Sequence, residues 1–255
     1  TTTANIAAGV GELEPPDQGL AVDNGTIAAI SNNTARAFDA SGNPLIAPVA
    51  TSVLFQVDFG DQLSDPHAVF DADSRRWFFE ELLWNPARGF YGFALAVSQT
   101  SDLFGPYYRY KIRAFSGDLR SCANDTCLPD YPQIGFDANG FFITANLFAI
   151  GGYGPFVAGA VYVLPKSLLA SGAAVRPVRF TTDDFVIQPS VPAAGEPFVA
   201  GNGGTEYLMS ARNIIDGSAD LRVGAIYHTA DIVSAPENLR GRFVDIAAQP
   251  YHRTA

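Results

Sequence analysis

The feature that most constrains this chain is a short pattern that recurs along the sequence. Each copy has an Asp, a short apolar segment, a turn made of Asp, Asn or Gly residues, and a second strand-like segment. Clear copies begin at Asp17, Asp65 and Asp130. A fourth, more divergent copy has its parts at 188–192, 197–200, 201–204 and 206–210, where 197–200 and 206–210 are expected strands.

Two further strand-like segments follow each of the last three copies, so that each repeat has the length of a four-stranded antiparallel sheet. Repetition of such sheets is typical of a β-propeller, in which each sheet is one blade. Short strands at even spacing also occur in a β-sandwich, but a sandwich does not require the repeated unit. We therefore predict an all-β propeller of four-stranded antiparallel blades. The further segments are 91–98, 107–112, 159–164, 178–180, 222–228 and 242–246.

No linker-like stretch or block of charge divides the sequence, so we predict a single propeller domain over residues 1–255. Four blades are readable, and 249–255 has the pattern of a strand that starts another. The ring then has about five blades, closed by the N-terminal segment, or is part of a larger ring and incomplete at the C-terminus. The apolar stretch 1–11 is expected to add a strand to a blade, and 165–170 is the one short helix we expect, because Pro165 suits a helix start.

The charge of the chain excludes some partners. The formal net charge is −10 at pH 7. A general nucleic-acid-binding protein needs a basic face, and an anionic membrane surface repels an acidic protein. The sequence also has no apolar run near the ~20 residues that a membrane helix needs. We predict neither nucleic-acid binding nor membrane insertion.

The two cysteines of the chain, Cys122 and Cys127, lie close together in a polar segment. A zinc site usually needs four ligands, whereas a closely spaced pair suits a local disulfide. Disulfides persist in oxidising compartments, so we predict a secreted or periplasmic protein. The alternative is two free thiols in a cytosolic protein.

Several motifs together resemble a group of secreted bacterial β-propeller proteins of unassigned function. The resemblance extends from about residue 12 to residue 207 and implies the fold but no reaction. The motifs that carry it are Glu14-Pro15-Pro16-Asp17-Gln18-Gly19-Leu20-Ala21-Val22, Asp65-Pro66, Arg76-Trp77, Leu95-Ala96-Val97-Ser98-Gln99-Thr100-Ser101-Asp102, Gly105-Pro106-Tyr107-Tyr108 and Asp130-Tyr131-Pro132-Gln133-Ile134-Gly135.

A weaker resemblance is to five-bladed glycosidase-type propellers, which carry an Asp base, a tuning Asp and a Glu acid on the innermost strands of successive blades. Asp65, Asp130 and Glu196 occur in that order here and are the implied catalytic residues. Glycoside cleavage needs two carboxyl groups that flank the bond, one of them kept protonated. However, Asp17 occupies the same repeat position as Asp65, and a repeated Asp often fixes a turn through its own hydrogen bonds.

Other residues are candidates for ligand binding rather than catalysis. His67 follows the Asp65-Pro66 motif, and Asp17 shares its repeat position. Aromatic rings near loops, among them Tyr131 and Trp84, suit stacking on sugar rings, although aromatic residues also fill the space between sheets.

Calcium is the cofactor that we leave open, although the predicted function requires none. The segments 71–74 and 137–140 resemble the start of a calcium loop, but they lack its terminal Glu and lie where a hairpin must turn. We predict plain turns there. Carboxylates elsewhere, such as Asp183 and Asp184, are the alternative calcium ligands.

These features favour a binding protein for a saccharide or another small polar ligand, held where polar groups converge in a concavity. One alternative is a glycoside hydrolase that uses Asp65, Asp130 and Glu196. The other is a structural or assembly protein, because an open blade edge invites pairing with a second chain or with another copy.

Overall fold

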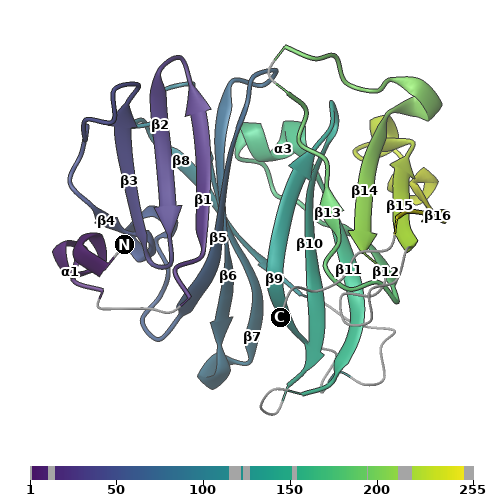
Figure 1. Cartoon of the computed structure of the whole chain (residues 1–255), viewed down its shortest axis with the longest axis horizontal. Coiled ribbons are helices and arrows are strands. Elements are labelled where there is room, and N and C mark those ends of the chain that lie inside the picture. The colour runs from purple at the N-terminus through teal and green to yellow at the C-terminus, as the bar shows by residue number, and fades with distance from the viewer. Residues whose placement is uncertain are drawn as a thin grey trace. The chain divides into compact units, whose positions relative to one another are not determined.

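The chain is all-β, and its strands form four antiparallel sheets of four strands each, as the repeat predicts (Figure 1). The structure is a computed structural model that describes residues 2–10, 15–114, 122, 127–150, 154–193, 195–211 and 220–249. In each sheet the strands follow chain order, so that neighbours are joined by hairpins.

The chain divides into two compact units, and each unit contains two of the sheets. Unit 1 is Thr1–Ser116 with Ala170–Ala173, and unit 2 is Gly117–Leu169 with Ala174–Ala255. Our prediction of a single domain concerns how these units combine, and it stays a prediction.

Unit 1 holds the first and second sheets. The edge strand β1 of the first sheet packs against the edge strand β5 of the second. Gly19 permits this close approach, because a Cβ there would lie 2.8 Å from the Cα of His67. The core between these sheets includes Trp77, Phe79 and Leu83. The strands are β1 (Gln18–Asp23), β2 (Thr26–Ser31), β3 (Thr34–Asp39), β4 (Val49–Ala50), β5 (Gln62–Asp71), β6 (Arg76–Asn85), β7 (Phe90–Ser98) and β8 (Tyr107–Arg113).

Unit 2 repeats this arrangement with the third and fourth sheets. Its edge strand β9 packs against the edge strand β13. Gly135 is the close-contact glycine, because a Cβ there would lie 2.4 Å from the carbonyl oxygen of Ser190. The strands are β9 (Cys127–Phe136), β10 (Gly140–Ala149), β11 (Phe156–Pro165), β12 (Val178–Thr182), β13 (Gln188–Pro189), β14 (Thr205–Ala211), β15 (Asp220–Tyr227) and β16 (Arg240–Ala247).

Helices are short. The helix expected at 165–170 is present as α3, whereas the expected N-terminal strand is wrong, because that stretch forms α1. The hydroxyl of Thr34 in β3 donates to the side chain of Asn5 in α1, which ties this helix to the first sheet. The helices are α1 (Thr2–Ala8), α2 (Thr51–Phe55), α3 (Lys166–Ser171), and the 3-10 turns η1 (Pro86–Arg88), η3 (Gly201–Gly203), η4 (Thr229–Asp231) and η5 (Pro236–Asn238).

The fourth copy of the repeat differs from the prediction at its first strand. Residues 197–200 are not a strand, and the edge strand of that sheet is instead β13, only two residues long. The return strand expected at 206–210 is correct and is β14. The predicted C-terminal strand at 249–255 lies outside the described residues beyond residue 249.

The repeated Asp–turn pattern has a local cause. Asp71 accepts a hydrogen bond from the backbone N–H of Asp73, at 3.1 Å. Asp137 accepts from the backbone N–H groups of Asn139 and Gly140, at 2.8 and 2.6 Å. Both segments therefore form the predicted turns, since each carboxylate caps its own hairpin.

The predicted disulfide between Cys122 and Cys127 is present. In the part of the chain that the structure describes, no helix is long and apolar enough to span a membrane.

Candidate functional site

The candidate site in unit 1 is a β-bulge at Asp65. The pairing of β5 with β6 shifts between Ser64 and His67, so that Asp65 and Pro66 interrupt the ladder. Asp65 has a φ of 54°, in the left-handed region. Such a conformation is uncommon for residues other than Gly, although Asp adopts it more readily than most. The bulge turns the half-buried Asp65 out of the regular alternation of the strand.

Asn32 connects this bulge to the first sheet. The amide nitrogen of Asn32 donates to the carboxylate of Asp17 at 3.0 Å and to the carbonyl oxygen of Pro15 at 2.7 Å. Its side-chain oxygen accepts from the backbone N–H of Asp65 at 2.9 Å. The hydroxyl of Ser64 donates to the Asp65 carboxylate at 2.9 Å. One buried amide therefore positions two of the residues predicted from the sequence, Asp17 and Asp65.

Two buried carboxyl groups lie behind the bulge, on the adjacent strand β6. Glu80 and Glu81 are completely buried, and Glu80 has no hydrogen-bond partner among the described residues. Burial raises the pKa of both groups well above the usual range, and the negative charge of Asp65 adds to the rise. For Glu81 the nearby Thr51 hydroxyl offsets part of the increase in pKa. Both groups are therefore protonated near neutral pH.

His67 and Trp84 lie on the same sheet as the bulge. His67 is half-buried and stands opposite Glu80 in the ladder. Trp84 is also half-buried and stands opposite Gln62, nearer the start of β5. The structure thus collects Asp17, Asp65 and His67 around one bulge, with Trp84 further along β6.

Unit 2 has a matching bulge with different residues. The pairing of β9 with β10 shifts between Thr144 and Asn146, and Tyr131 has a φ of 51°. Tyr131 thus corresponds to Asp65, while Asp130 corresponds to Ser64. The side chain of Tyr131 is 44% exposed. The two predicted Asp residues therefore do not occupy equivalent positions in their sheets.

Glu196 does not lie on an innermost strand, as the glycosidase resemblance implied. It is exposed in the loop between β13 and β14. The buried Glu of this sheet is Glu206 on β14, which accepts hydrogen bonds from the backbone N–H of Ser190 at 2.7 Å and from its hydroxyl at 3.0 Å. Burial raises the pKa of Glu206 to about 8. The sequence signal for this group was an acidic residue within a strand-like segment.

The carboxylates named as alternative calcium ligands have a protein cation beside them. Arg222 contacts Asp183 at 2.8 Å and Asp184 at 3.4 Å, and it also pairs with Asp245. Across the described residues, no group of three or more His, Cys, Asp or Glu side chains is arranged to hold a metal ion.

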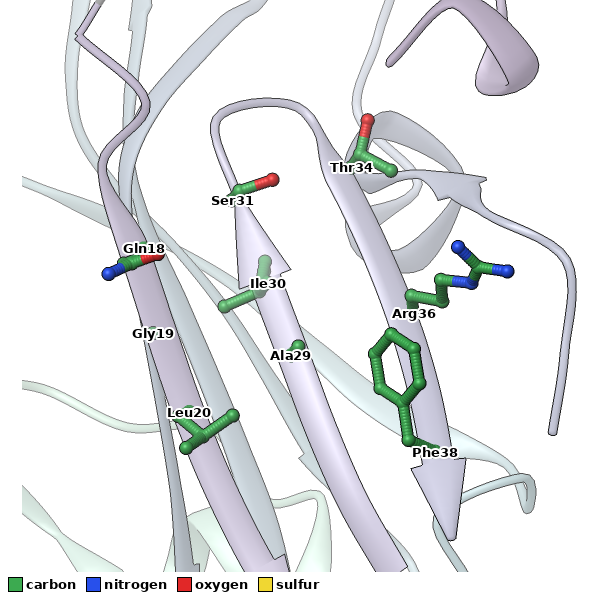
Figure 2. A pocket seen from close by; sticks show the side chains of 9 residues that line it. All are labelled: Gln18, Gly19, Leu20, Ala29, Ile30, Ser31, Thr34, Arg36 and Phe38. Carbon is green, nitrogen blue, oxygen red and sulfur yellow. The ribbon is translucent and has the colours of Figure 1, made fainter. Parts of the chain in front are cut away.

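A cavity of about 460 Å³ lies on the first sheet, away from the Asp65 bulge (Figure 2). None of the predicted catalytic or ligand-binding residues lines it. Its walls are mostly apolar, with one cation. The lining residues are Gln18, Gly19, Leu20, Ala29, Ile30, Ser31, Thr34, Arg36 and Phe38.

The fold is shared with solved glycoside hydrolases of family 43. A β-1,3-galactosidase solved with galactodeoxynojirimycin has a TM-score of 0.50 and 9% identity, over 93% of this chain and 77% of that chain. A second family-43 β-1,3-galactosidase has a TM-score of 0.48 and 12% identity, over 93% of this chain and 47% of that one. An exo-β-1,3-galactanase from Clostridium thermocellum has a TM-score of 0.44 and 9% identity, over 89% and 47%.

The first of these likenesses defines the class of fold. The four sheets match a large part of a five-bladed propeller, as predicted, and identity this low shows the fold alone. The chain spans about half the length of the other two proteins. No protein-family model and no curated protein matches the sequence, so the resemblance to secreted bacterial propellers stays a prediction.

Proposed function

We propose that this chain is an exported saccharide-binding protein whose ligand contacts the Asp65 bulge of unit 1. The observation that carries the proposal is the shared support of Asp17 and Asp65 by the Asn32 amide. Sugar hydroxyls donate hydrogen bonds, and a pair of half-buried carboxylates held in fixed positions is a suitable acceptor for them.

The surroundings of the bulge support a binding role. Glu80 and Glu81 are protonated near neutral pH because burial raises the pKa of each. The carboxylates of Asp17 and Asp65 therefore do not face two further negative charges from below. Both Glu side chains are completely buried, so neither reaches a ligand at the surface.

The shared fold suggests the first ligands to test. A protein of that fold was solved with galactodeoxynojirimycin, so galactose, a β-1,3-linked galactose disaccharide and that imino sugar are the initial probes. The disulfide Cys122–Cys127 supports export, because such bonds persist in oxidising compartments.

Isothermal titration with these three probes tests the proposal. Asp65→Asn and Asp17→Asn keep the side-chain shape, and Asn tolerates the left-handed backbone of position 65. We expect each change to weaken binding at least tenfold. The matched control is Asp23→Asn at the far end of β1, which should bind as the unchanged protein does. Equal binding by all variants would exclude the bulge as the site.

A glycoside hydrolase is the second candidate, and the shared fold is what favours it. Against it, Glu196 lies in an exposed loop, and Asp65 and Asp130 hold non-equivalent positions. Hydrolysis of a nitrophenyl β-galactoside, abolished in Asp65→Asn and in Asp130→Asn, would establish this alternative. Release that persists in both variants would come from a contaminating enzyme.

A further inference from the structure

We propose that copies of this chain associate head to tail, with the exposed face of the first sheet of one copy against the exposed face of the fourth sheet of another. This inference is independent of the saccharide site and uses different residues. It commits the assembly alternative predicted from the sequence to one occupant, a second copy of the chain.

The first of the two surfaces, face A, is the outer face of the sheet β1–β4. Leu20, Ala29 and Arg36 form one row across β1, β2 and β3, as Figure 2 shows. Val22, Ile27 and Phe38 form the next row. The side chain of Leu20 is 63% exposed and that of Val22 55%. Face A is therefore apolar and open, with Arg36 as its cation.

The opposite face of this sheet provides the comparison. Ala21, Ala28 and Ala37 form a row there, and each is buried. Ala21 and Ala28 belong to the core that this sheet shares with the second sheet. The sheet thus has apolar residues on both faces, which is the pattern of a sheet covered on both sides.

The second surface, face B, is the outer face of the sheet β13–β16 in unit 2. Met209, Val223 and Val244 form a row across β14, β15 and β16. Tyr207 and Ile246 extend the same face. Met209 is 50% exposed, and Tyr207, Val244 and Ile246 are exposed to a similar extent. The other face of this sheet buries Leu208 and Ile226 in a core.

The chemistry of the two faces favours contact between A and B. The Nε atom of Arg36 is buried without a hydrogen-bond partner among the described residues, and its guanidinium lies over the ring of Phe38. Tyr207 and Met209 on face B are groups against which a guanidinium packs well. Pairing face A with itself would instead bring two Arg36 side chains together, and pairing face B with itself would do the same for Arg242.

The packing inside each unit supplies the precedent. Consecutive sheets pack face to face in unit 1 and again in unit 2. Contact between face A and face B of two copies would repeat this sheet-on-sheet packing between chains. Because the two surfaces differ, the contact is heterologous.

Sedimentation equilibrium of the unmodified protein gives the first test. We expect species at multiples of 27.1 kDa that dissociate on dilution. Each copy has a net charge of −10, so added salt should screen the repulsion and strengthen the association. A 27.1 kDa monomer at every concentration and salt level would overturn the proposal.

Two variants test which faces meet. Leu20→Lys with Val22→Lys disrupts face A, and Met209→Lys with Val244→Lys disrupts face B. Each variant alone should be at least tenfold weaker in self-association. An equimolar mixture should form a heterodimer, because one intact face A and one intact face B remain. Phe59→Lys, at a fully exposed residue outside both faces, is the control and should associate normally.

The outcomes separate the alternatives. Self-association of the face-B variant alone would mean that face A pairs with itself, and the converse holds for the face-A variant. Either result, or a mixture that stays monomeric while circular dichroism shows folded variants, would refute head-to-tail contact.

Discussion

The substitution Glu206→Gln should stabilise the protein at neutral pH. Glu206 is buried on β14, and its carboxyl accepts two hydrogen bonds from Ser190. A Gln side chain has nearly the same shape, and its amide oxygen can accept the same two bonds. What the substitution removes is the titratable proton.

The magnitude follows from the two pKa values of the Glu206 carboxyl. Burial raises the pKa to about 8, against 4.5 for the exposed group. Below pH 4.5 the carboxyl is protonated in both the folded and the unfolded chain, and its contribution to stability is fully present. As the pH rises toward 8, the unfolded chain gains from ionising this group and stability is lost. At about 1.4 kcal/mol per pH unit, the loss is roughly 3 kcal/mol by pH 7.

Urea unfolding at several pH values measures this difference. The variant and the unmodified protein should have similar pH-independent stabilities at pH 4, and the variant should gain progressively between pH 5 and pH 8. The effects of Glu80 and Glu81 cancel, because both proteins carry them. Glu237→Gln, at an exposed Glu of the same unit, is the control. A difference that does not change with pH would refute the reasoning, since it would come from packing and not from titration.

Two further predictions concern the packing and the disulfide of unit 2. Gly135→Ala should lower the free energy of unfolding by about 1–3 kcal/mol, because the new Cβ meets the carbonyl oxygen of Ser190; Gly201→Ala, with no atom within 4 Å of its new Cβ, should be nearly neutral in the same urea titration. Replacing Cys122 and Cys127 by Ser should cost less than the ~3 kcal/mol of a 15-residue loop, and a larger loss in thermal unfolding would contradict a purely local role for the bridge.

The sheets were predictable because their signals are local. An Asp that caps its own hairpin, as Asp71 and Asp137 do, leaves the same short pattern wherever the hairpin recurs. Two strands left no such pattern, because β4 and β13 are only two residues long. The segment 197–200 is apolar, but pairing partners decide whether an apolar segment becomes a strand, and these come from elsewhere in the chain.

The candidate site was predictable only in part. Asp17, Asp65 and His67 stand near recognisable repeat positions, so the sequence indicated them. Asn32 was missed, because a polar residue between two strands is ordinary in a turn and its role depends on contacts with Asp17 and with Asp65. The buried Glu80 and Glu81 did leave a signal, namely two acidic residues within an otherwise apolar strand.

The two bulges explain how a repeated fold can carry a specific site. Both occur at the same place in the pairing of an edge strand with its neighbour, and both put a residue other than Gly at positive φ. Such a conformation costs of order 1–3 kcal/mol and persists where the surrounding structure enforces it. A bulge needed only for backbone geometry would tolerate Gly at both places. Asp65 in one sheet and the exposed Tyr131 in the other are instead a hydrogen-bond acceptor and an aromatic ring, the two kinds of group that saccharide recognition uses.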